Sequence, residues 1–311
     1  MAVVGTLLAL LVFFTLFGLF LTQYVPLWMS ENESAFTSGA ATSFAQFKSQ
    51  VDSQYVLDAP PVLGTPFTIS SAGIPLLAQP TQGVINFLPQ VCPGGFNATA
   101  PGIGQPKNPS FCVFENQTIA PAFGGHGNLS YEVTTGILDM LLPNRYFTSE
   151  LFALEADGVV QVQSGMNQLM AYAPPLNLTR LAGNTTVSSS FLQLLGNATT
   201  VSGQGSEEVY SHLKFSQQLS YNGYNATSHV LRAFNYTFEI GTEWPCAWSS
   251  FLWHQLNVSG IPSTQYKWSP YRGSCGTALG TTTVLTLSLT AVNYVSLFYA
   301  GTQVSVGIGS S

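Results

Sequence analysis

The first part of the chain is apolar on every side of the helix that it predicts. The run AVVGTLLALLVFFTLFGLFL occupies residues 2–21, and no charged residue precedes Glu31. About 20 apolar residues in a helix reach roughly 30 Å, which is enough to cross a bilayer. Because no side of this helix is polar, it must be buried by lipid or by neighbouring copies of the chain.

The pattern then narrows to one apolar stripe. Apolar residues recur at spacings of three and four, which marks one face of a helix, at Phe36, Ala40, Phe44, Phe47, Val51 and Tyr55. The helix should end near Tyr55, because Asp58-Ala59-Pro60-Pro61 cannot continue it. Pro26 should kink the helix or locally melt it. Together the two patterns predict one element of roughly 55 residues and roughly 80 Å.

From Pro60 onward the sequence changes to short β-prone runs separated by glycine- and proline-rich turns. The runs are residues 129–142, 152–162, 230–240, 281–292, 294–299 and 302–308. Many short strands with such turns favour a sandwich or barrel over a parallel α/β sheet. We therefore predict an α+β chain. Residues 1–57 form an assembly helix, and residues 58–311 form a β-rich, sandwich-like head that could divide into two lobes near residue 143.

The composition raises the question of what keeps the head soluble. Only 7% of the residues are charged, against roughly a quarter in ordinary soluble domains. The net charge of −6 comes from 14 acidic and 8 basic residues, and the basic residues are scattered from Lys48 to Arg272. Phosphate binding needs clustered Lys and Arg, so we expect no nucleic acid among the partners.

N-glycosylation sites are frequent in the sequence, and glycans could keep the head soluble. The N-x-[ST] sequon occurs 10 times, whereas chance would give about 3, at Asn32, Asn97, Asn116, Asn128, Asn177, Asn184, Asn197, Asn225, Asn235 and Asn257. Glycans are bulky and solubilising, and they would supply the missing surface polarity. We expect about seven or more of these sites to carry a glycan.

The four cysteines, Cys92, Cys112, Cys246 and Cys275, suit two disulfides in an oxidising compartment. Local pairing of Cys92 with Cys112 and of Cys246 with Cys275 is preferred among the three possible connectivities, although the sequence alone does not decide between them. Each pair would close a loop of about 20–30 residues and stabilise the head by roughly 3 kcal/mol.

Sequence motifs for catalysis or metal binding are absent. There is no G-x-S-x-G elbow, no H-E-x-x-H pair, no P-loop and no G-x-G-x-x-G after a strand. The cysteines lack C-x-x-C spacing, and the histidines are isolated, at His126, His212, His229 and His254. We therefore expect no enzymatic activity, no metal and no cofactor.

Two later stretches carry further predictions. Tryptophans gather around Cys246, from Trp244 to Trp268. They could form a carbohydrate-binding platform, but buried packing is the favoured interpretation, because Trp dominates cores as well. No sequon lies beyond Asn257, and roughly the last 30 residues are β-prone and apolar. We expect that stretch to be shielded, either as central strands of the head or at a subunit contact.

The start MAVVGTLLALLVFFTLFGLFLTQYVPLWM resembles the mature N-terminus of archaeal type IV pilins and archaellins, and Gly5 suits the archaeal branch of that family. The resemblance covers about 55 residues. It implies that a short basic leader is removed by a dedicated peptidase. It also implies that the uncharged helices bundle at the centre of a filament while β-rich heads face outward.

The expected function is that of a structural subunit of an extracellular, type IV pilus-like filament at the cell surface. Its partners would be further copies of the chain, the membrane before assembly, and covalent N-glycans. The filament-core residues would be Leu7, Leu10, Phe13, Phe14, Phe17, Phe20 and Leu21, with Gly5 and Gly18 permitting close approach. The alternative is a membrane-anchored cell-surface glycoprotein, such as an adhesin or sheath component. The third hypothesis is a secreted or anchored enzyme without a known motif.

Overall fold

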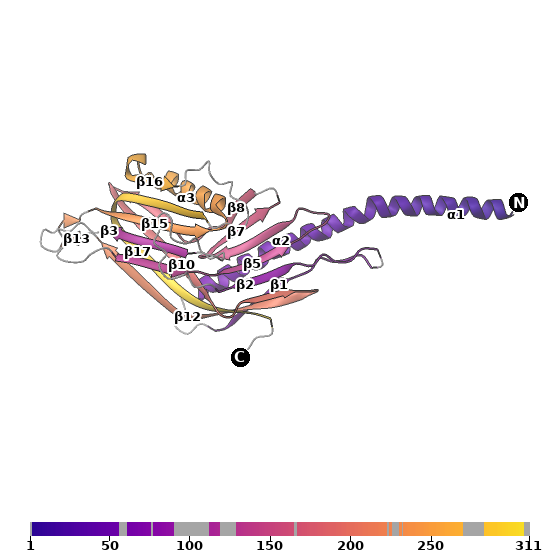
Figure 1. Cartoon of the computed structure of the whole chain (residues 1–311), viewed down its shortest axis with the longest axis horizontal. Helices are drawn as coiled ribbons and strands as arrows, with labels where there is room; N and C mark the ends of the chain where they lie inside the picture. The colour runs from indigo at the N-terminus through magenta and orange to yellow at the C-terminus, as the bar shows by residue number, and fades with distance from the viewer. Residues whose placement is uncertain are drawn as a thin grey trace.

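The structure, a computed structural model, is one long helix followed by a β-rich head. It describes residues 2–55, 61–75, 77–89, 112–118, 129–164, 167–222, 224–225, 230–231, 233–269 and 283–307. The N-terminal part of the helix projects away from the head, and the rest of the helix enters it (Figure 1). The predicted α+β class is confirmed.

The helix is continuous from Val3 to Gln54 and is built from α1 (Ala2–Leu19), a π-helical turn η1 (Phe20–Tyr24) and α2 (Val25–Gln54). The backbone N–H of Val25 bonds to the carbonyl of Phe20. Pro26 follows and has no N–H to donate, and the wider π turn gives its ring room. The helix therefore changes direction near Pro26 without melting (Figure 1).

The predicted stripe on the second half of the helix lies inside the head. Phe36, Ala40, Phe44, Phe47 and Val51 are each at most 5% exposed. They belong to one apolar cluster with side chains of the surrounding strands, including Phe67 and Phe152. The ring of Phe44 lies 5.1 Å from that of Phe67. The helix ends at Gln54, with Tyr55 as its cap, as predicted.

The larger sheet contains nine strands in the part of the chain that the structure describes, with the main order β1-β12-β17-β15-β3-β4. Its centre is β17, which pairs with β10 in parallel and with β12, β15 and β16 in antiparallel fashion. The strands are β1 (Leu63–Thr68), β3 (Cys112–Thr118), β4 (Leu129–Thr134), β9 (Asn177–Leu181), β10 (Asn184–Leu195), β12 (Ser206–Asn222), β15 (Phe234–Thr242), β16 (Tyr266–Ser269) and β17 (Thr283–Val306).

A second, antiparallel sheet has the order β11-β2-β5-β6-β7-β8 among the described strands. Its strands are β2 (Val84–Leu88), β5 (Ile137–Leu142), β6 (Glu150–Glu155), β7 (Gly158–Gln163), β8 (Asn167–Tyr172) and β11 (Thr199–Ser202). One face contributes Leu138, Met140 and Phe152 to the cluster around α2. The other face contributes Ala153 and Val160 to a second core. A short pair, β13 (Tyr224–Asn225) with β14 (Val230–Leu231), lies outside both sheets.

The second core contains helix α3 (Pro245–Ser259), which sequence reasoning did not predict. Pro at the first position and Gly260 in the left-handed conformation (φ 68°) define its ends, as is common for helices. A single 3-10 turn, η2 (Ser263–Gln265), follows. Trp244 and Trp248 are buried, which confirms packing rather than an exposed carbohydrate platform at these two residues.

The three β-prone runs predicted after residue 281 are one strand of 24 residues, β17. Gly301 lies within this strand. The Phe215 ring occupies the space that a side chain at residue 301 would need, which accounts for a glycine there. Asn293 also stays in the strand, and its Oδ1 accepts a hydrogen bond from the Thr185 N–H at 2.9 Å. The prediction that the C-terminal stretch is shielded is confirmed, because β17 is central to the sheet.

Candidate functional site

The apolar first part of the helix is largely exposed. Residues 3–17 are all exposed. The exposed fractions are 64% for Leu7, 61% for Phe13 and 41% for Phe17. Of the other predicted filament-core residues, Leu10, Phe14 and Leu21 are exposed and Phe20 is half-buried. This helix is long and apolar enough to cross a membrane, and a surface of this kind requires lipid or other copies around it.

Its few polar side chains add no polarity to that surface. The hydroxyl of Thr6 donates to the Val3 carbonyl at 2.9 Å, and that of Thr15 donates to the Val12 carbonyl at 2.8 Å. These bonds close within the helix, so no side-chain donor is left in need of water. The whole segment therefore presents an apolar face to any neighbour.

The surface of α1 is also uneven, as close packing of helices requires. The rings of Phe13 and Phe17 stack with centroids 5.9 Å apart. A shallow hollow beside Phe14 is lined by Leu7, Leu10, Leu11 and Thr15. An added side chain at Gly5 or Gly18 would meet nothing within 4 Å in the single subunit, which leaves both glycines accessible to another helix.

A belt of aromatic residues marks the point where the apolar segment ends. Tyr24 is 55% exposed and Trp28 is 43% exposed. The Phe20 ring contacts the Trp28 ring edge-on, with centroids 5.6 Å apart. The first charged residue of the chain, Glu31, follows one turn later and is exposed. Such a sequence of apolar, aromatic and charged positions is typical of a membrane–water boundary.

Glu33 attaches the helix to the head just beyond this belt. Its side chain is fully buried. The carboxylate accepts hydrogen bonds from the Thr81 hydroxyl at 2.5 Å and from the backbone N–H groups of Arg145, Tyr146 and Phe147 at 2.7–3.1 Å. Burial alone would raise the pKa of Glu33, but these hydrogen bonds outweigh it and lower the pKa below its usual value of 4.5. The charged form is therefore the one that the site binds.

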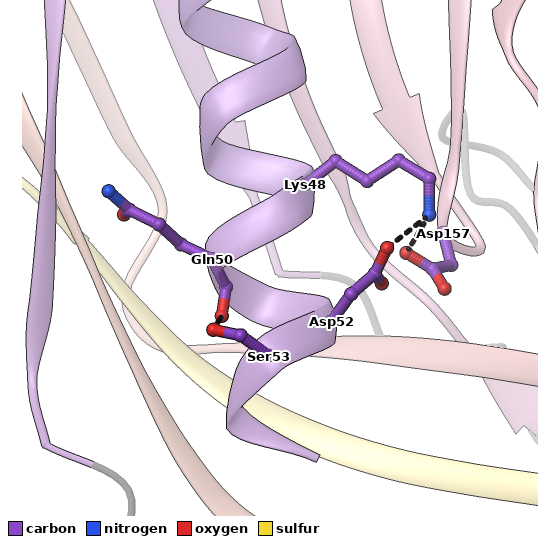
Figure 2. A network of polar contacts seen from close by, with 5 residues as sticks. All are labelled: Lys48, Gln50, Asp52, Ser53 and Asp157. Atoms are coloured by element: carbon purple, nitrogen blue, oxygen red, sulfur yellow. Dashed lines mark hydrogen bonds and ion pairs between the residues drawn. The ribbon is translucent and has the colours of Figure 1, made fainter. Parts of the chain in front are cut away.

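Lys48 makes a second attachment further along α2. Its Nζ lies 3.0 Å from Asp52 on the same helix and 3.0 Å from Asp157, which is fully buried in the β6–β7 turn. Figure 2 shows the ammonium group between the two carboxylates, while Gln50 and Ser53 lie on the other side of the helix. Burial would lower the pKa of Lys48, but the two carboxylates raise it. The lysine therefore stays charged.

Further polar contacts fix the position of α2 along its axis. The Ser43 hydroxyl donates to the Pro66 carbonyl at 2.8 Å, and the Gln54 amide donates to the Ser211 carbonyl at 3.0 Å. The Asn144 amide donates to the Thr37 hydroxyl at 3.0 Å. Because each bond joins the helix to a different part of the head, sliding the helix by one turn would break all of them at once.

Burial raises the pKa of four described carboxyl groups in the head, Asp139, Glu155, Asp157 and Glu243. Burial raises the pKa of Glu155 to about 8, against the opposing hydrogen bonds from Trp248 and Thr242. Its Oε2 has no hydrogen-bond partner among the described residues. Burial also raises the pKa of Asp139 to about 6, and the Asn86 amide opposes this shift. Glu155 and Asp139 therefore favour their protonated forms relative to an unfolded chain.

Six sequon asparagines have described side chains, and the structure places five of them in solvent. Asn177, Asn184, Asn197, Asn235 and Asn257 are exposed. Asn32 is half-buried on α2, and its amide donates to the Ala72 carbonyl at 3.0 Å. Asn97 and Asn128 lie outside the described residues, as do the side chains of Asn116 and Asn225.

Each predicted disulfide includes at least one residue outside the description. Cys92 and Cys275 are not described, and of Cys112 only the backbone is. His126 and His229 also lie outside it. Over the described part of the chain, no group of three or more His, Cys, Asp or Glu side chains is placed to bind a metal ion.

Sequence reasoning missed Glu33, Lys48 and Asp157. The signal for Glu33 was present, because it lies on the helix face that also carries Phe36 and Ala40, where an acidic residue predicts a buried partner. No such signal marked Asp157. Comparisons with protein-family models, with curated proteins and with solved structures give no match for this chain.

Proposed function

We propose that this chain is a structural subunit of an extracellular, type IV pilus-like filament. The first part of the helix, residues 2–21, would lie in the membrane before assembly and among the helices of neighbouring copies afterwards. The β-rich head would face outward and carry N-glycans. The work of such a subunit is mechanical and adhesive, and it needs neither a catalytic residue nor a cofactor.

One observation supports this proposal above the others. The exposed apolar segment runs without a linker into the core of the head, where Glu33 and Lys48 attach it. A simple anchor works equally well through a flexible linker. A filament, in contrast, repeats one contact between copies, so the angle between helix and head must be the same in every subunit. The attached helix provides that fixed angle.

The surface of α1 supports assembly as well. It offers stacked aromatic rings, a hollow and two glycines, all of which allow side chains of a second helix to interdigitate. Burial of such a surface between copies would contribute roughly 25 cal/mol per Å² of apolar area. The exposed sequons lie on the head, where glycans would leave the helices free to pack.

A membrane-anchored cell-surface glycoprotein is the second candidate. Exposed Tyr24 and Trp28, directly after an apolar segment of bilayer length, favour residence of the helix in lipid. The two candidates differ in whether the helix leaves the membrane. A filament subunit occupies both states, whereas an anchored glycoprotein occupies only the first.

Replacement of Phe17 by Asp tests the proposal. A carboxylate among apolar helices costs roughly 2–3 kcal/mol or more, so cells that produce Phe17→Asp should release no filaments. The conservative variant Phe17→Leu should assemble normally. The variant Leu181→Asp, on an exposed hairpin of the head, should also assemble. Normal filaments from Phe17→Asp would overturn the proposed assembly through α1.

A further inference from the structure

A loop of the head extends on the side from which α1 leaves. This β1–β2 loop, which the structure describes for residues 71–75 and 77–82, emerges from the sheets beside the helix on the side of its N-terminal part (Figure 1). Its base is attached to the helix twice, through the bond from Asn32 to Ala72 and the bond from Thr81 to Glu33. The Ser71 N–H closes the base by donating to the Thr81 carbonyl at 2.9 Å. The loop therefore has a fixed direction relative to the helix.

The tip of this loop is apolar and polar groups in its backbone are paired. Pro75 and Leu77 are exposed, and Ile74 is half-buried. The N–H of Ile74 and the N–H of Ala78 each donate at 2.9 Å to the other residue's carbonyl. Because the N–H groups of Ile74 and Ala78 are already paired, they need no hydrogen bond to water when the tip approaches an apolar medium. In addition, no charged residue occurs between residues 59 and 106.

A second turn beside the helix carries the complementary chemistry for a lipid headgroup. Residues 145–147 donate their backbone N–H groups to Glu33, which places this turn next to the base of the β1–β2 loop. Arg145 is exposed and forms no ion pair within the described residues. Tyr146 is 45% exposed. An arginine can bind a phosphate through several N–H groups, and tyrosine favours the headgroup region.

The geometry points to a lipid-docking face on the head, made by the tip residues Ile74, Pro75, Leu77 and Ala78 together with Arg145, Tyr146 and Trp28. This face would contact the surface of the bilayer that α1 crosses, with the apolar tip at the acyl-chain boundary and Arg145 on a lipid phosphate. The head of the unassembled subunit would then lie against the membrane in one orientation. The inference rests on the membrane stage of the proposed function.

Photo-crosslinking of the full chain in nanodiscs tests this inference. The nanodiscs contain phosphatidylcholine and phosphatidylglycerol, and the probe is a phospholipid with a diazirine near the ester end of one acyl chain. Mass spectrometry then locates the lipid adducts. Adducts on α1 and on residues 73–80 are expected. Adducts on α1 alone would overturn the docking face and leave the membrane stage intact, whereas absence of adducts from α1 would overturn both.

Two variants make the test specific. Leu77→Asp should lower the adducts on the loop tip roughly ten-fold, because an exposed carboxylate opposes insertion at the interface, and should leave those on α1 unchanged. Leu181→Asp is the matched control. Leu181 lies on the β9–β10 hairpin, which meets β17 near Val292. The β1–β2 loop follows the end of β1 that pairs with the start of β12, and the start of β12 pairs with β17 near Val306. The control residue and the loop therefore lie at different positions along β17. Unchanged tip adducts in Leu77→Asp would contradict the inference.

Discussion

The carboxylate of Glu33 accepts a hydrogen bond from the backbone N–H of Tyr146 at 2.7 Å, across 113 residues of sequence. Two more N–H groups and one hydroxyl complete the same site. Through this contact, the point where the helix becomes exposed is joined directly to the second sheet. The apolar segment is therefore attached to the head at this point.

Replacement of Glu33 by Gln should destabilise the head. The amide keeps the size of the side chain, but it loses the charge and turns an N–H₂ group toward backbone donors, which should cost ~2 kcal/mol. Thermal unfolding of the full chain in mild detergent, followed by tryptophan fluorescence, measures the effect. The matched control is Glu31→Gln, which changes an exposed acid on the same helix and should shift stability by less than ~0.5 kcal/mol. Equal effects of the two substitutions would contradict the role of Glu33.

Replacement of Lys48 by Met should cost ~3 kcal/mol at neutral pH, because Asp157, whose pKa burial raises to about 7, loses the cation that opposes this rise. The double variant Lys48→Met/Asp157→Asn should recover much of that loss, since it removes the uncompensated charge. Asn suits residue 157, because its φ of 69° is left-handed and Asn tolerates that conformation. Denaturant unfolding of the wild type, Lys48→Met, Asp157→Asn and the double variant gives the coupling energy between the two residues. If the losses of stability from the two single substitutions simply add in the double variant, the ion pair does not stabilise the attachment of the helix to the head.

The raised pKa of Glu155 predicts that the contribution of this residue to the stability of the head is largest in acid. Burial raises this pKa from 4.5 to about 8, so the folded state binds a proton that the unfolded chain releases at lower pH. The resulting stability is fully present below about pH 4.5 and is lost as the pH rises toward 8. Asp139, whose pKa is about 6, contributes in the same direction over a lower range.

Melting temperatures between pH 4 and pH 9 test this prediction. The variant Glu155→Gln imitates the protonated acid, so its melting temperature should match the wild type near pH 4 and exceed it near pH 9. Glu33 acts in the opposite sense, because its lowered pKa makes stability fall below about pH 4.5. A wild-type melting temperature that rises steadily from pH 5 to pH 9 would contradict the prediction.

Glycan occupancy should follow exposure. Asn177, Asn184, Asn197, Asn235 and Asn257 are exposed and should be modified in chains purified from producing cells. Asn32 should have the lowest occupancy of the six, because its amide bonds to the head within a helix. Glycopeptide mass spectrometry measures each site separately. A high occupancy at Asn32 together with empty exposed sites would contradict the exposure argument.

The helix was predictable because its signals are local. The stripe from Phe36 to Val51 repeats with the helix period, and the proline-rich sequence after Tyr55 ends it. The single long β17 was not predictable in this way. Gly301 resembles a break in the sequence, yet it is a site of close approach for Phe215, whose position depends on the pairing of β12 with β17. Such pairing is a property of the whole fold.

In the candidate site, too, the features with local sequence signals were predictable and the contacts between distant residues were not. The apolar segment and its bulky residues, including Phe13 and Phe17, could be predicted from composition alone. The contacts that attach the helix to the head could not be predicted, because the partners of Glu33 and Lys48 are distant in sequence, at residues 81, 145–147 and 157. Helix α3 was missed although Pro245 and Gly260 carry its start and stop signals, because its two tryptophans, Trp248 and Trp253, were interpreted as core packing or a carbohydrate platform rather than as part of a helix.

Cryo-electron microscopy of filaments sheared from producing cells, with mass spectrometry to identify this chain, tests the assembly proposal most directly. The expected result is a helical fibre that contains this chain, with residues 2–21 of many copies packed at its centre and glycan-coated β-rich heads outside. The contradictory result is that no fibre contains the chain and that all of it remains in the membrane fraction. In that case the apolar helix is a membrane anchor only.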